Sequence, residues 1–256
     1  MRILMIGDVV GRPGRKTVQQ FLPGLCHDYR IDLVIANGEN SAGGIGITLD
    51  TAQELFACGV DAITTGNHVW AKKEIIPHLD EDLPIIRPLN YPPNAPGRGS
   101  LKVKGVLIVN LIGRVFIAGG FDCPFRAMDS LLSEVDKDSK IIIVDFHAEA
   151  TSEKVAMGRY LDGKVSAVLG THTHIATADA CILPQGTAYV TDVGMVGPVD
   201  SVIGVDTESS IRSFLTGMPH RFFTGEGPAS LDAILVEVDD STGRAISIKR
   251  IQKKEE

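Results

Sequence analysis

Short apolar runs recur along the chain, and each ends in a polar segment that contains glycine or another turn-forming residue. Such runs are typical of buried β-strands. The pattern predicts strands at Arg2–Ile6, Leu33–Ala36, Ala62–Thr65, Ile141–Val144 and Val165–Leu169. Helical patterns between several of them predict helices at Arg15–Tyr29, Leu49–Cys58, Phe125–Val135 and Ser152–Tyr160. Alternation of strand and helix favours an α/β fold with a largely parallel sheet.

Two stretches depart from this alternation. After Pro84, closely spaced runs with tight connections predict an antiparallel meander of Leu101–Val103, Val106–Leu111 and Val115–Ala118. Near the C-terminus, a turn predicts pairing of Ala233–Val238 with Ala245–Ile251, and Asp206 is expected to cap a helix over Thr207–Leu215. Because no linker or repeat interrupts the chain, the simplest organisation is one domain, residues 1–256, with two sheets face to face and helices outside.

Composition narrows the classes of partner. Of the 256 residues, 44% are hydrophobic and 22% charged, which is ordinary globular composition. No apolar stretch approaches the roughly 18 residues of a membrane span, and no signal peptide is expected, because the first apolar run stops at Gly7. The net charge of −7 and the scattered basic residues argue against a duplex nucleic-acid partner. A small-molecule substrate is expected, and homo-oligomer formation stays open.

The cysteines point to the cellular compartment. All four lie far apart in the sequence, and no CxxC pair occurs among them. This spacing favours reduced thiols and a cytoplasmic protein over a disulfide or zinc framework.

Ligand-type side chains gather where the predicted strands end. They are Asp8, Glu39, Asn40, Asn67, His68, His147, His172 and His174. In open α/β sheets, ligands bind beyond the carboxyl ends of the strands, so these side chains are expected to share one site. Neighbours on a strand point to opposite faces, and the glycines before Glu39 and Asn67 permit both members of each adjacent pair to reach it. His172 and His174 are two apart and can project to one side.

This set of side chains predicts a pair of metal ions. Carboxylate, amide and imidazole ligands without thiolate suit manganese, iron or zinc. Even seven of these eight side chains would be too many ligands for one ion, which favours two ions bridged by one carboxylate. Two divalent ions against two carboxylates leave about +2, or roughly +1 with a bridging hydroxide, which is where a phosphate needs positive charge.

The motifs resemble those of the calcineurin-like metallophosphoesterases. The matching elements are Gly7-Asp8, Gly38-Glu39-Asn40, Gly66-Asn67-His68, His147 and Thr171-His172-Thr173-His174. Val10 replaces the usual His of the first motif, and Glu39 replaces the usual Asp of the second. With the stretches 145–151 and 192–198, these departures resemble the YmdB-like bacterial subfamily.

The resemblance implies a four-layer α/β/β/α sandwich and a phosphodiesterase that acts on 2′,3′-cyclic nucleotides. One metal would be held by Asp8, Glu39, Asn40 and His174, and the other by Glu39, Asn67, His147 and His172. Glu39 would bridge them, and His68 would remain free of metal as the general acid. A metal-bridging hydroxide would attack phosphorus in line, with iron or manganese favoured and zinc as an alternative.

Simpler interpretations stay open for several residues. Asp8 could cap a loop, His147 could be a buried core histidine, Asn40 could stabilise a turn, and His68 could be a metal ligand. His27, His78 and His220 lie outside the motifs and are expected at the surface. The loop after the first strand matches neither a dinucleotide nor a Walker glycine pattern.

Three features bear on the substrate. The glycine-rich segment 43–46 is expected beside the site, and Tyr91 is a candidate platform for a base. No strand-end motif supplies a basic clamp, which favours a singly charged diester over a monoester, although Arg12, Arg126 or Arg221 could fold into the pocket. A phosphomonoesterase or protein phosphatase, and a non-catalytic nucleotide-binding regulator, remain alternatives.

Overall fold

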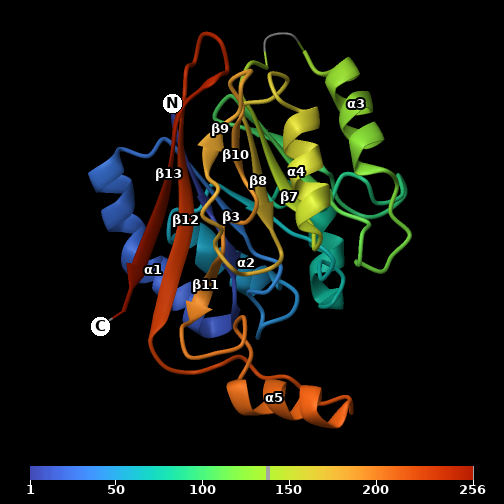
Figure 1. The fold of residues 1–256 in the computed structure, drawn as a ribbon, viewed down its shortest axis with the longest axis vertical. Helices are drawn as coiled ribbons and strands as arrows, with labels where there is room; N and C mark the ends of the chain where they lie inside the picture. The colour runs from blue at the N-terminus through green and yellow to red at the C-terminus, as the bar shows by residue number, and fades with distance from the viewer. Residues whose placement is uncertain (137–138, 256) are drawn as a thin grey trace.

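The strands of the computed structural model, which describes residues 1–136 and 139–255, form two sheets packed face to face (Figure 1). The first sheet has the order β2-β11-β12-β1-β3-β4, with β13 paired to β12. Its strands are β1 (Arg2–Ile6), β2 (Asp8–Val9), β3 (Leu33–Asn37), β4 (Ala62–Thr64), β11 (Met195–Pro198), β12 (Ala229–Val238) and β13 (Ala245–Lys254). The strands β1, β3 and β4 are parallel neighbours, so their carboxyl ends lie at one edge.

The second sheet has the order β5-β6-β7-β8-β10-β9. Its strands are β5 (Ser100–Val103), β6 (Val106–Ile112), β7 (Ile142–His147), β8 (Ala167–Thr171), β9 (Cys181–Ile182) and β10 (Ala188–Val190). The run β6, β7, β8 and β10 is parallel, while β5 and β9 are antiparallel at the edges. Both sheets are therefore mixed.

Alternation along the strands produces three apolar cores. In β1, Leu4 and Ile6 pack toward α1 (Gly11–Tyr29) and α2 (Leu49–Ala57), while Ile3 and Met5 face the second sheet. In β7, Ile143 faces the first sheet, and its neighbours pack toward α3 (Pro124–Glu134) and α4 (Thr151–Tyr160). The layers are helix, sheet, sheet and helix, which confirms the predicted four-layer sandwich (Figure 1).

Two further helices lie outside this layer scheme or at its border. The 3₁₀ helix η1 (Lys73–Asp80) adds Ile75 and Leu79 to the core beneath α1 and α2. Helix α5 (Thr207–Thr216) lies at the foot of the sandwich in Figure 1. The Asp206 side chain accepts a hydrogen bond from the Ser209 N–H, which confirms the predicted cap.

One predicted strand is wrong. Residues 115–118 are not a strand, and β6 pairs on its other side with β7 in parallel. The carboxylate of Glu153 accepts hydrogen bonds from the N–H groups of Arg114 and Val115, so this backbone is withdrawn from ladder pairing. Phe116 then has a positive φ of 65° and an exposed ring. The predicted meander therefore reduces to the β5–β6 hairpin.

Two chain-wide expectations concern membranes and thiols. All four cysteines are free. No helix within residues 1–136 and 139–255 combines the length and hydropathy that a membrane span requires.

Candidate metal centre and active site

The carboxyl ends of strands from both sheets meet at one end of the sandwich and bring all eight predicted side chains together. The first sheet and its loops supply Asp8, Glu39, Asn40, Asn67 and His68, and the second supplies His147, His172 and His174. The two halves of the set meet at Glu39, whose Oε1 lies 3.1 Å from His147 Nε2 and 3.3 Å from Asn40 Nδ2. Glu39 therefore lies in contact with both His147 and Asn40, and its bridging role stays a prediction.

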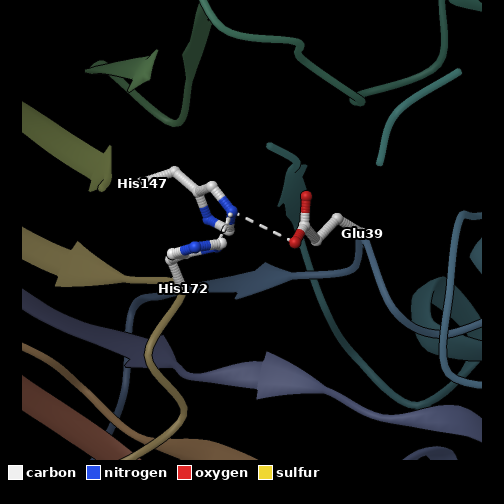
Figure 2. Close-up of side chains that lie close together, drawn as sticks. All are labelled: Glu39, His147 and His172. Atoms are coloured by element: carbon white, nitrogen blue, oxygen red, sulfur yellow. Dashed lines mark hydrogen bonds and ion pairs between the residues drawn. The ribbon is translucent and has the colours of Figure 1, made fainter. Parts of the chain in front are cut away.

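We call Glu39, Asn67, His147 and His172 the inner ligand group. Around His147 Nε2 lie His172 Nδ1 at 3.0 Å and Glu39 Oε1 at 3.1 Å (Figure 2). Asn67 Oδ1 lies 3.0 Å from the same nitrogen. A single proton on one nitrogen cannot bond well to three acceptors, whereas a divalent cation can be bound by all four atoms. The donor set of this group therefore fits a metal ion.

The far side of His147 is fixed by a chain of hydrogen bonds. Thr171 Oγ1 donates to Asp145 Oδ1 at 2.7 Å, so it accepts from His147 Nδ1 at 2.9 Å. Asp145 is fully buried and also accepts from the hydroxyl of Thr64 and the amide of Asn37. Burial raises the pKa of Asp145 to about 6. This chain places the proton on Nδ1 and leaves Nε2 to face the site.

His172 is oriented by a residue that sequence reasoning did not select. Its Nε2 lies 3.0 Å from a carboxylate oxygen of Glu149, which leaves Nδ1 to face His147. Burial, together with repulsion from His147, lowers the pKa of His172 to about 4, so the ring is neutral at pH 7. Neutral imidazole is the form that binds a metal.

Asp8, Asn40 and His174 form what we call the outer ligand group. His174 donates from Nδ1 to the Ile203 carbonyl at 2.8 Å, so Nε2 faces Asp8 Oδ1 at 3.6 Å and Asn40 Nδ2 at 3.1 Å. Asp8 is buried, and its Oδ1 has no hydrogen-bond partner among the described residues. Since buried polar atoms are normally paired, this oxygen fits a cation ligand better than a loop cap.

Asn40 lies in the group with its amide nitrogen turned inward. Nδ2 faces Glu39 and His174, while Oδ1 lies 2.9 Å from His68 Nδ1. To coordinate through oxygen, the amide would rotate by half a turn, and Nδ2 would then face His68 Nδ1 in place of Oδ1. Its ligand role stays a prediction.

The charges of the site demand cations. Burial opposes ionisation of Glu39, yet the imidazoles of His147 and His68 hold its pKa well below the ordinary value. Burial also opposes protonation of His174, but the carboxylate of Asp8 raises its pKa to about 9. Both buried carboxylates thus depend on neighbouring imidazoles, and His174 is protonated beside Asp8 at pH 7. Divalent ions would supply positive charge to both carboxylates and displace the His174 proton.

His68 differs from the ligands in its exposure. Its backbone N–H donates to Glu39 Oε2 at 3.1 Å, and the ring bonds to Asn40 through Nδ1. The side chain is 33% exposed and lines the cavity above the ligands. The ring is thus held beside the ligands with its other nitrogen, Nε2, outside those contacts.

Comparison of the whole chain with known proteins decides its family. A family model described as YmdB-like protein matches residues 4–251. The chain belongs to the YmdB-like protein family. The 2′,3′-cyclic-nucleotide 2′-phosphodiesterase of Bacillus subtilis is 48% identical over 255 residues, covering 98% of this chain and 96% of the relative. The names of the curated relatives support a phosphodiesterase or phosphatase activity.

Solved structures of similar chains have the same fold. A hypothetical protein from Thermus thermophilus has a TM-score of 0.94 and 46% identity, with 100% of both chains covered. A phosphatase from Mycoplasma pneumoniae has a TM-score of 0.94 and 37% identity, covering 99% of this chain and 93% of that one. The predicted metallophosphoesterase resemblance and its YmdB-like branch are confirmed.

The YmdB-like departures have a visible consequence at the site. Val10, which stands where related metallophosphoesterases carry a histidine, is buried and lines the cavity. A Cβ at Gly204 or Gly197 would meet the Val10 side chain, so the valine fills the space between these two glycines. This part of the site is apolar.

The cavity above the ligands has a volume of about 490 Å³. Glu39, Asn40, His68, His172 and His174 contribute to its lining. The remaining wall is largely apolar and glycine-rich, with Gly43, Gly44, Ile45, Ile203, Val205, Phe222 and Phe223. The expected place of the glycine-rich segment is confirmed. Sequence reasoning missed Phe222 and Phe223 as lining residues. Two adjacent aromatic residues in an otherwise polar segment were the signal that could have indicated them.

Other candidates lie elsewhere. Tyr91 packs edge-on between Trp70 and Phe121 and lines a different cavity, so the proposed base platform is wrong. Arg12 and Arg126 line other cavities, and the Arg221 guanidinium lies over the Phe223 ring. Among the described residues, no arginine or lysine lines the cavity above the ligands. His27, His78 and His220 are also outside it.

Proposed function

We propose that the chain is a metal-dependent phosphodiesterase that hydrolyses 2′,3′-cyclic nucleotides, with residues 1–256 as one catalytic domain. The observation that carries this proposal is the pair of ligand groups sharing Glu39 beneath a cavity that no described arginine or lysine lines. The similarity to a 2′,3′-cyclic-nucleotide 2′-phosphodiesterase supports the substrate class.

Two transition-metal ions would occupy the two ligand groups. The inner group would hold one ion through Glu39, Asn67, His147 and His172, and the outer group would hold the other through Asp8, Glu39, Asn40 and His174. The mixed oxygen and nitrogen donors favour iron or manganese, with zinc as an alternative. When bound, such ions lower the pKa of water and neutralise the charge that develops on phosphate oxygens.

His68 is proposed to donate the proton that the leaving oxygen needs. The ring is anchored through Nδ1 to Asn40, and the side chain lines the cavity where a substrate would lie. A ribose alkoxide is a poor leaving group, and protonation by a positioned acid is typically worth about 10²–10⁴-fold.

The charge of the cavity favours a diester. A cyclic phosphodiester carries one negative charge, whereas a monoester carries nearly two and is commonly bound by arginine or lysine clamps. The cavity lining contains the carboxylate of Glu149 but no arginine or lysine among the described residues. A second negative charge on the substrate would therefore lie near a carboxylate without an arginine or lysine clamp.

The proposal is tested by kcat/KM for 2′,3′-cyclic AMP, 3′,5′-cyclic AMP and a phosphomonoester at equal metal loading. We expect the 2′,3′-cyclic nucleotide to be preferred. If kcat/KM for the monoester is higher by about tenfold, a phosphatase activity replaces this function. That ratio corresponds to a transition-state preference of about 1.4 kcal/mol for the monoester dianion. No turnover of any ester by the metal-loaded protein would favour a nucleotide-binding regulator.

A further inference from the structure

A buried ion pair lies behind the ligands without touching the cavity. Lys154 Nζ on α4 lies 2.6 Å from Asp192 Oδ2, and the two side chains are 1% and 0% exposed. Neither residue supplies a candidate ligand or lines the cavity. Two charges taken out of water incur a desolvation penalty, so a pair this deeply buried is expected to form further hydrogen bonds that offset it.

Asp192 connects the pair to the loop that carries two candidate ligands. Its Oδ2 accepts from the Thr173 N–H at 3.1 Å and from the Thr173 hydroxyl at 2.8 Å. Its Oδ1 accepts from the Gly194 N–H at 2.9 Å. Both oxygens of the carboxylate thus face only donors, and Thr173 stands between His172 and His174.

The backbone on either side of Thr173 needs such an anchor. His172 has φ of 98° and His174 has φ of 64°, in the left-handed region that non-glycine residues rarely adopt. Such conformations persist only where the surroundings hold them. Hydrogen bonds to an ionised carboxylate are stronger than those between neutral groups. The ammonium of Lys154 favours the ionised form of the Asp192 carboxylate inside the core.

The segment beginning at Asp192 is also hydrogen-bonded to the first sheet. The Gly194 carbonyl accepts from the Asp8 N–H at 3.0 Å, and the Val193 N–H donates to the Gly170 carbonyl at 2.8 Å. Asp8 Oδ2 in turn accepts from the His172 N–H at 3.1 Å. One short segment therefore sets the position of ligand loops that come from opposite sheets.

We propose that Lys154 and Asp192 are positioning residues, which fix Thr173 so that His172 and His174 face the metal ions at the correct distance from Asp8. This inference rests on the proposed metal site. It assigns a role to the stretch 192–198, which the ligand set leaves without one.

The test is Co²⁺ binding to Asp192→Asn, followed by calorimetry and by the visible absorption of the bound ion. An amide has one acceptor oxygen, so it must release either Gly194 or Thr173. We expect Co²⁺ affinity to fall about 10- to 100-fold, as for other residues that orient metal ligands, with a changed Co²⁺ spectrum. The double variant Lys154→Met with Asp192→Asn also removes the lysine charge that the single variant leaves unpaired. Its melting temperature should be higher than that of Asp192→Asn, while its Co²⁺ affinity and spectrum should stay as altered as in the single variant.

Asp162→Asn is the matched control. Asp162 is a buried carboxylate that accepts from the N–H groups of Gln185 and Thr187, at the opposite end of β8 from the ligands. The Asp162→Asn variant should have a lower melting temperature than the wild type and unchanged Co²⁺ binding. If Asp192→Asn does not fold, Thr173→Val removes only the hydroxyl donor and should weaken Co²⁺ binding about two- to tenfold, with Thr187→Val as its control.

Two results would overturn the proposal in different ways. Wild-type affinity and spectrum in Asp192→Asn, in the double variant or in a folded Thr173→Val would remove the positioning role and leave the proposed function intact. A wild-type protein that binds no Co²⁺ would remove the proposed function, and the positioning role with it.

Discussion

The two ligand groups are built to different degrees. In the inner group, His147 is held from behind by Thr171, and His172 is held by Glu149. In the outer group, the Ile203 carbonyl orients His174, but Asp8 keeps an oxygen without a hydrogen-bond partner among the described residues, and the Asn40 amide faces inward with its nitrogen. Protein contacts therefore preorganise the inner group more fully than the outer group, which a cation would complete.

This difference predicts that the two groups bind metal with unequal affinity. Contacts that orient a ligand before binding reduce the cost of ordering it, so the inner group should bind first. Both groups border the cavity, the inner group through Glu39 and His172 and the outer group through Asn40 and His174. The following variants and conditions separate the two groups.

Gly66→Ala should have the largest effect, because it breaks the inner group. A Cβ at Gly66 would overlap the ring of His147 and the carboxylate of Glu39. We expect loss of both metals and of activity beyond the roughly 10⁴-fold that loss of an acid can cause. Elemental analysis and turnover measure this. Gly24→Ala, on α1 with nothing within 4 Å of the new Cβ, is the control and should leave both unchanged.

Glu39→Gln and His68→Ala should separate metal holding from proton donation. The Glu39 variant removes the charge shared by both groups, so metal content and turnover should fall together. The His68 variant should keep both metals and lose about 10²–10⁴-fold in kcat, least for a nitrophenolate leaving group that needs no proton. Depletion of metal in His68→Ala would place that residue among the ligands.

A smaller effect is expected from pH, and it belongs to the outer group. The pKa of His174, ordinarily 6.5, is raised to about 9 before metal binds, so its proton is retained up to that pH and must be displaced by the ion. Mn²⁺ affinity at the outer group should therefore rise with pH by up to about tenfold per unit and level off near pH 9. Calorimetry in two buffers should detect the released proton. A pH-independent affinity between pH 7 and 8.5 would contradict this.

Much of the architecture follows from local pattern. The apolar runs locate β1, β3, β4, β7 and β8, because buried parallel strands are continuous apolar segments bounded by turns. The same runs locate the ligands at their ends. The error at residues 115–118 arises because Glu153, distant in sequence, binds that backbone, and local pattern carries no signal for such a contact.

The supporting residues could not be found in this way. Asp192 and Lys154 are 38 positions apart, and Asp145 is linked to His147 through Thr171 on another strand. His172 and His174 do share one site as predicted, but they reach it through left-handed backbone and not through strand alternation. Distances between loops are set by the packing of the two sheets, which becomes visible only in the fold.

Stepwise metal titration would distinguish a two-metal site with unequal halves from a site that needs one ion or none. Metal-free protein should bind about two Mn²⁺ per chain, the first ion more tightly than the second, with turnover of 2′,3′-cyclic AMP appearing as the second ion binds. Full activity with one ion or with none would contradict the two-metal site.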